Sequence, residues 1–199
     1  MNRFLNQQYF DEQLSRQLAS GVDSRPQSAV RDSKGQILFQ LQTGGMMSPV
    51  KTELRTGSAL MRFASGAIAP DIAMAGGWWI EQASFDRILR FSQVHDVPLI
   101  LAARILCGVP PEWSDMRQLV RVRLRHELLA WRGLANSVIV PYPAGGPAVK
   151  LLHQNSLSER RLPQLFIPGL DRMPIMEVFQ FERVDRFNEM DSKRGWLYL

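Results

Sequence analysis

The sequence is poor in the residues that bind metals and form covalent cross-links. It contains a single cysteine, Cys107, and only three histidines, His95, His126 and His153, among 199 residues. One cysteine excludes a disulfide within the chain, and the histidines are too widely spaced for a recognisable zinc-ligand pattern. We therefore expect no structural metal, and a reducing compartment fits this composition.

Long hydrophobic runs are also missing. The apolar stretches are interrupted by Asp71 or Arg104 before they reach the roughly 20 residues that a membrane-spanning helix requires. Residues 1–18 do not have the charged-then-apolar order of a signal peptide. We expect a cytoplasmic protein without a membrane-spanning segment. An effector that is made in the cytosol and then injected would have the same features.

Several familiar catalytic motifs are absent. The sequence has no Walker-type phosphate loop, no G-x-G-x-x-G, no G-x-S-x-G and no H-E-x-x-H. Basic residues are in excess, with 24 Lys and Arg against 19 Asp and Glu and a net charge of +5. This balance favours an anionic partner, which is a nucleotide, a nucleic acid or an acidic protein surface.

The order of the expected elements favours an α+β fold, a single mixed domain with an antiparallel-rich sheet. Helical spacing predicts helices over 3–18, 85–95 and 98–107. Strands are expected in the segments 37–42, 58–65, 77–80, 119–124, 164–167 and 175–184. Because helices and strands do not alternate in a regular βαβ rhythm, a doubly wound sheet is not favoured. We assign residues 1–57 to an N-terminal helix and a loop-rich extension, and residues 58–199 to the α+β core domain.

A strand with a basic face is expected at 119–124. Arg121, Arg123 and Arg125 alternate with apolar residues, and Arg117 comes just before them. Such a face can bind a phosphate backbone. It can equally be a solvated edge strand that resists aggregation through its charge.

Two adjacent tryptophans follow a pair of glycines. In a strand, Trp78 and Trp79 point to opposite sides, so one is expected in the core. The other can line a ligand cleft, where the bare backbone of Gly76 and Gly77 lets a ligand approach. A purely structural pair is the alternative. Ser84 follows, near the start of the next helix.

A carboxylate and an amide stand close together near the C-terminus. Gln180 and Glu182 are two residues apart on an expected strand and therefore on one face. Facing a cleft, Glu182 can bind a ribose hydroxyl and stabilise positive charge that develops nearby. The alternative is a pair of solvated strand residues.

The order of these segments resembles the ADP-ribosyltransferase fold of bacterial toxins and effectors. That family has an arginine at the end of a first strand, then a strand–helix unit with a small hydroxyl residue, and later a glutamate in an E-x-E or Q-x-E setting. Here Arg62, Ser84 and Glu182 stand in these places, within residues 58–184. This sequence departs from the family at 78–81, which read Trp-Trp-Ile-Glu where a Ser-Thr-Ser-like motif is usual.

The resemblance implies an NAD-dependent transferase, and it implies a role for each matched residue. Arg62 binds the pyrophosphate or ribose of NAD, Trp78 or Trp79 stacks on nicotinamide, and Ser84 completes the cofactor site. Glu182 hydrogen-bonds the ribose and favours an oxocarbenium-like transition state, and Gln180 orients the acceptor. The resemblance then implies a toxin or effector of a mobile element.

Two other functions stay open, so the sequence alone does not decide whether the protein is an enzyme. One is a non-catalytic nucleic-acid-binding protein that uses the Arg117–Arg125 segment. The other is a subunit of an assembly that docks through the amphipathic N-terminal helix on a protein partner, although packing of this helix on its own domain is the simpler interpretation.

Overall fold

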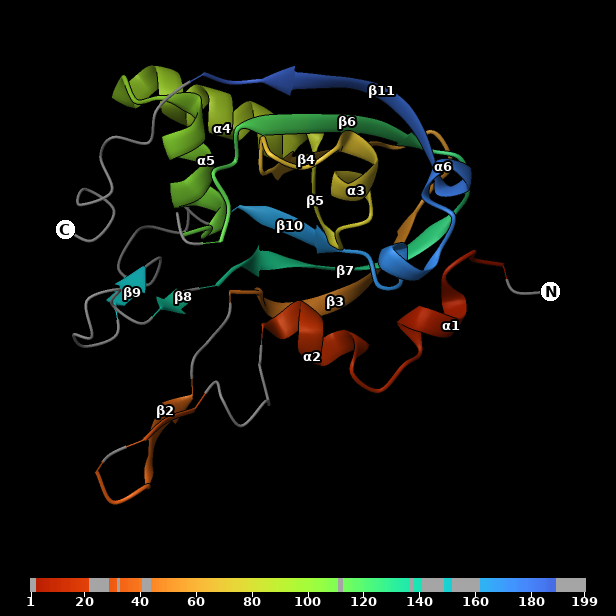
Figure 1. The fold of residues 1–199 in the computed structure, drawn as a ribbon. Helices are drawn as coiled ribbons and strands as arrows, with labels where there is room; N and C mark the ends of the chain where they lie inside the picture. Colours follow the sequence, from red (N-terminus) through yellow and green to blue (C-terminus); the bar gives the residue numbers. More distant parts are fainter. Residues whose placement is uncertain are drawn as a thin grey trace.

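Seven antiparallel strands form the centre of the fold (Figure 1). The computed structural model describes residues 3–21, 29–31, 33–40, 44–110, 113–136, 138–140, 149–151 and 162–188. Within these residues the chain has the predicted α+β fold, with helices packed on an antiparallel sheet.

The strands of the sheet lie side by side in an order that differs from their order in the sequence. From one edge to the other they are β11 (Phe179–Arg186), β6 (Gln118–Leu124), β4 (Ala59–Ala64), β5 (Trp78–Glu81), β10 (Pro163–Phe166), β7 (Leu128–Ala135) and β3 (Met46–Leu54). Two strand pairs are separate from this sheet: β1 (Ala29–Arg31) with β2 (Ile37–Gln40), and β8 (Val138–Val140) with β9 (Val149–Leu151).

Helices cover both faces of the sheet. On one face α4 (Gln82–His95) and α5 (Leu99–Cys107) bury a cluster that includes Met61, Ile88 and Leu119. On the other face α3 (Pro70–Met74), the 3₁₀ turn η3 (Leu170–Arg172) and α6 (Ile175–Val178) close a second cluster. No helix in the described part of the chain is long and apolar enough to cross a membrane.

The alternation in β6 explains how one strand contributes to both clusters. Val120 and Val122 are fully buried in the cluster under α3 and α6. Leu119 points the other way, into the cluster under α4 and α5. Since successive side chains of a strand point to opposite faces, Arg121 then lies on the α4 side, where its guanidinium stacks on Phe85 at 4.7 Å.

The N-terminal segment is two short helices and not the one helix expected over 3–18. They are α1 (Gln7–Phe10) and α2 (Ser15–Ser20). The buried side chain of Asn6 explains why the chain turns back onto the domain so early. Its Oδ1 accepts a hydrogen bond from the backbone N–H of Leu129, and its Nδ2 donates to the carbonyl of Leu129, both at 2.8 Å. Phe10 is buried and stacks on Trp131 with 4.5 Å between ring centroids. The segment therefore packs on its own domain.

Part of this segment nevertheless remains exposed and apolar. Leu14, the N-cap residue of α2, and Leu18, within α2, are 57% and 56% exposed. Their spacing of four residues places them on one face of the helix. Docking of a protein partner through the N-terminal helices stays a prediction for this face.

Strand β3 lies within residues 1–57, where the sequence predicts a helix and a loop-rich extension. Residues 46–54 lie within the range assigned to the N-terminal extension, but they pair with β7 as an edge of the main sheet. A second correction concerns 175–184, which begins with the helix α6 before β11 starts at Phe179.

Candidate functional site

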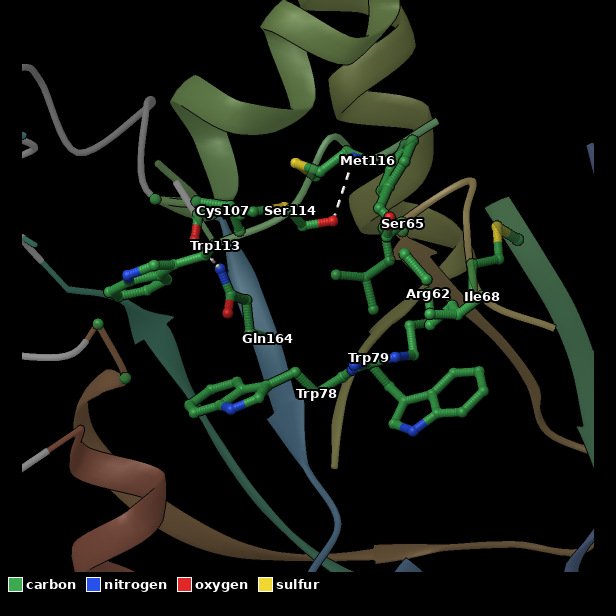
Figure 2. Close-up of a pocket in the computed structure, with 18 residues that line it drawn as sticks. Arg62, Ser65, Ile68, Trp78, Trp79, Cys107, Trp113, Ser114, Met116 and Gln164 are labelled. Atoms are coloured by element: carbon green, nitrogen blue, oxygen red, sulfur yellow. Dashed lines mark hydrogen bonds between the residues drawn. The ribbon is translucent and has the colours of Figure 1, made fainter. Parts of the chain in front are cut away.

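A pocket opens where two neighbouring strands separate. β4 pairs with β5 only through Leu60 with Glu81 and Met61 with Ile80. Beyond these pairs, a cavity of about 470 Å³ is lined by the ends of both strands, by β10 and by the loop that follows α5 (Figure 2). The sheet thus leaves a gap at this point, and side chains from distant parts of the sequence surround it.

Arg62 is the charged group of this pocket. Its Nη1 donates to the carbonyl of Trp78 at 2.7 Å, while its Nε is fully buried and has no hydrogen-bond partner among the residues that the structure describes. Among the described residues, no carboxylate forms an ion pair with it. Desolvation lowers the pKa of the guanidinium to about 10, so that it stays cationic at neutral pH. The residue as a whole is half-buried, but its guanidinium is largely removed from water. A desolvated cation without a counter-ion is costly, and an anion in the pocket would offset that cost.

Gly76 makes room for this guanidinium. A Cβ at position 76 would overlap Cζ and Nη2 of Arg62, and its backbone has no positive φ that would demand glycine. The absence of a side chain at this position therefore serves the close approach of Arg62 to the backbone before β5.

The two tryptophans differ in burial. Trp79 is 1% exposed, donates from Nε1 to the Gly76 carbonyl at 2.8 Å, and packs on Phe179. Trp78 is half-buried at the pocket and packs on Phe166, with 5.1 Å between ring centroids. Both residues line the pocket, but only Trp78 has a side chain with accessible surface to offer a ligand.

Trp113 and Gln164 are among the pocket residues that sequence reasoning missed. Trp113 lies in the loop after α5, is 44% exposed and has its ring next to Gly44, where a Cβ would lie 3.0 Å from the ring. The available signal was a large aromatic residue just after the turn residues Pro110 and Pro111. Gln164 is a buried amide in β10, and no feature of the sequence distinguishes it from an ordinary strand residue.

Cys107 also lines the pocket, but its chemistry is unfavourable for a nucleophile. Burial of the thiol raises its pKa to about 12, although part of the residue surface is exposed. Since the thiolate is the reactive form, the thiol is unreactive at neutral pH.

Ser84 does not reach the pocket. It lies in the first turn of α4, is 3% exposed, and donates from Oγ to the carbonyl of Pro163 at 2.8 Å. This hydrogen bond ties α4 to the start of β10. The observed role of the hydroxyl is therefore to position α4 on the sheet.

Gln180 and Glu182 lie away from Arg62. Both are exposed on β11, which is separated from β4 by β6. The register shifts between Phe181 and Arg183, so Glu182 has no paired residue on β6. Its carboxylate forms an ion pair with Arg123. The structure thus brings Arg62, Trp78 and Trp79 together, and it places Gln180 and Glu182 on a different part of the sheet.

The basic strand face is largely occupied by partners from β11. Arg121 pairs with Asp185 at 2.9 Å, Arg123 pairs with Glu182, and Arg125 donates to the Phe179 carbonyl at 3.1 Å. Arg117, at the end of the loop before β6, is partly exposed, and its backbone N–H donates to Oδ1 of Asp115 at 3.1 Å. The carboxylates of β11 neutralise much of the positive charge that this face would need to bind a nucleic acid.

We expect the double variant Arg121→Ala, Arg123→Ala to change nucleic-acid affinity little. It should instead lower the free energy of unfolding by about 1–2 kcal/mol, because it removes the Arg123 partner of Glu182 and leaves Asp185 with the longer contact to Arg183 at 3.4 Å. Titrations of labelled DNA and RNA at several salt concentrations, together with urea denaturation, test this, with Arg90→Ala on α4 as a control. Steeply salt-dependent binding that only the double variant weakens would favour the nucleic-acid interpretation.

The described residues contain no group of three or more His, Cys, Asp or Glu side chains that could hold a metal ion. The described residues that line the pocket include no Asp, Glu or His. What the arrangement can do chemically is to bind a negative charge at Arg62 beside the ring of Trp78.

Comparison with known proteins found similarity to solved structures only. No family model and no curated protein matches the sequence. Among solved structures, the chain is similar to Rhs1-CT in complex with its cognate immunity protein RhsI1, with a TM-score of 0.43 and 13% identity over 77% of this chain and 89% of that chain. At this distance the likeness carries no argument about function.

Proposed function

We propose that the protein binds a small anionic molecule in the pocket between β4 and β5, with Arg62 as the anion-binding group. One observation supports this above all: the buried Nε of Arg62 has no partner, and no described carboxylate pairs with the guanidinium. Arginine offers several N–H donors in one plane, which suits phosphate and carboxylate oxygens.

A nucleotide is the class of anion that suits the other residues lining the pocket. Trp78 and Trp113 present aromatic surface at the same pocket that holds Arg62. Aromatic side chains stack on flat rings, while a guanidinium takes the phosphate. NAD, which the resemblance to ADP-ribosyltransferases implies, belongs to this class and is the first ligand to test.

ADP-ribosyl transfer by a toxin or effector is the narrower form of this proposal. It rests on the order of the Arg62, Ser84 and Glu182 segments in the sequence. Because Glu182 is paired with Arg123 and lies across β6 from Arg62, the geometry favours anion binding over the transferase reaction.

We expect Arg62→Met to weaken binding of NAD, ADP-ribose and inorganic pyrophosphate by about tenfold or more, since a charge-assisted hydrogen bond contributes about 1.5–3 kcal/mol. Tryptophan fluorescence and thermal-shift titrations measure this. Arg90→Met, a change of an exposed arginine on α4, is the matched control. Equal affinities in the wild type and Arg62→Met would contradict the proposal.

Glu182→Ala separates binding from transfer. We expect it to leave the affinity for NAD within about twofold, because Glu182 is not among the residues that line the pocket. NAD consumption by the wild type that disappears in both Glu182→Ala and Arg62→Met would support the transferase. Without such turnover, anion binding remains and the transferase form is rejected.

A further inference from the structure

The amide of Gln164 has a defined orientation in the pocket. Gln164 is 7% exposed, and its Nε2 donates to the carbonyl of Cys107 at 2.8 Å. A carbonyl oxygen can only accept, so the NH₂ group has to face Cys107 and the amide oxygen Oε1 faces away from it. None of the hydrogen bonds of the described residues uses Oε1. Gln164 therefore presents an unused acceptor to the pocket.

Two aromatic rings line the same pocket as this acceptor. Figure 2 shows the amide end of Gln164 between the rings of Trp113 and Trp78 in this view. Trp78 is held by Phe166, and Trp113 is held against Gly44. The surroundings of Oε1 thus suit a flat ring, and a ring that enters there meets an acceptor at its edge.

A ring without a donor would be disfavoured at this place. It would take Oε1 away from water and offer no hydrogen in return, which leaves a buried acceptor unsatisfied. A site that hydrogen-bonds one group of a ligand rejects an analogue that lacks this group more strongly than an apolar pocket does.

We propose that Gln164 selects ligands whose ring carries an NH₂ group, such as the 6-amino group of adenine or the carboxamide of nicotinamide. This inference rests on the proposed function, since it assigns the ring end of the ligand whose anionic end Arg62 binds. Gln164 is then a specificity-determining residue. Its amide oxygen accepts a hydrogen bond from the NH₂ group of the ligand, while the tryptophans stack on any ring of suitable size.

Two matched pairs of ligands test the inference on the full chain. Adenosine 5′-monophosphate is compared with purine riboside 5′-monophosphate, which has hydrogen in place of the amino group. Nicotinamide mononucleotide is compared with its 3-acetylpyridine analogue, which has a methyl group in place of the amide nitrogen. In the wild type, for whichever ring binds, we expect the NH₂ member to bind about tenfold tighter.

The variant Gln164→Met removes the acceptor and keeps the length of the side chain. We expect the affinity ratio within the pair to fall to about one, while Gln93→Met, on the exposed side of α4, keeps it. The wild-type ratio needs no variant, so it tests the inference even if Gln164→Met does not fold. A ratio of one in the wild type, or a ratio that persists in Gln164→Met, overturns the inference while Arg62-dependent binding still stands. Binding of no anion, or binding indifferent to Arg62→Met, overturns the proposed function itself.

Discussion

Replacing Trp79 by alanine is expected to lower the free energy of unfolding by about 3–5 kcal/mol, as large-to-small changes of buried aromatic residues do. Trp79 is 1% exposed and lies 4.9 Å from the ring of Phe179 between centroids. Its indole nitrogen also donates to the carbonyl of Gly76 at 2.8 Å. The variant therefore loses buried apolar surface, an aromatic contact and a hydrogen bond, and it leaves a cavity.

The neighbouring residue is the matched control. Trp78→Ala should lower the free energy of unfolding by only about 1–2 kcal/mol, because Trp78 is half-buried and packs mainly on Phe166. It should in turn weaken nucleotide binding, since its ring borders the pocket. Urea denaturation with fluorescence or circular dichroism measures both stabilities. If the two variants were equally stable, or Trp78→Ala were the less stable, the division into core and cleft tryptophan would be wrong.

The parts of the fold that could be predicted are those in which local periodicity and burial agree. In β6 the alternation of Val120 and Val122 with arginines matches the observed faces, and α5 ends at Gly108, which has a φ of 67°. Each of these elements has its apolar residues against the core at the spacing that its own geometry requires. The α+β class followed from their order.

Strand β3 was missed because a proline is normally evidence against a strand. Pro49 lies in an edge strand, where a missing N–H need not remove a ladder hydrogen bond. The register shifts between Met47 and Val50, and Ser48 between them has a φ of 45°. A bulge of this kind depends on the pairing with β7, which is more than seventy residues away in the sequence and gives no local signal.

Only the part of the candidate site that lies on strands adjacent in both the sequence and the sheet was predictable. Arg62 and Trp78 meet because β4 and β5 are adjacent in both sequence and sheet. Glu182 does not join them, because β6 is inserted between β4 and β11. Motif order along a chain does not contain this information, since the order of strands in a sheet is set by the packing of the whole domain.

Gly76→Ala is expected to remove Arg62 from the pocket without changing its charge. A methyl group at this position would overlap the guanidinium, so the side chain has to move away and gives up its hydrogen bond to Trp78. Anion affinity should then fall by roughly one to two orders of magnitude, as expected for the loss of hydrogen bonds from a charged group. The same fluorescence and thermal-shift titrations that measure Arg62→Met measure this change.

A double-mutant cycle distinguishes this displacement from a general disturbance of the loop before β5. The three atoms nearest to the added Cβ all belong to Arg62, so Gly76→Ala should be harmless once Arg62 is alanine. In that background we expect a neutral effect or a gain of about 0.4–1 kcal/mol, because alanine restricts the unfolded chain and the backbone at 76 has no positive φ. In the wild-type background the same change should destabilise. An equal loss of stability in both backgrounds would show that Gly76 is required by the backbone, and it would separate the glycine from the function of Arg62.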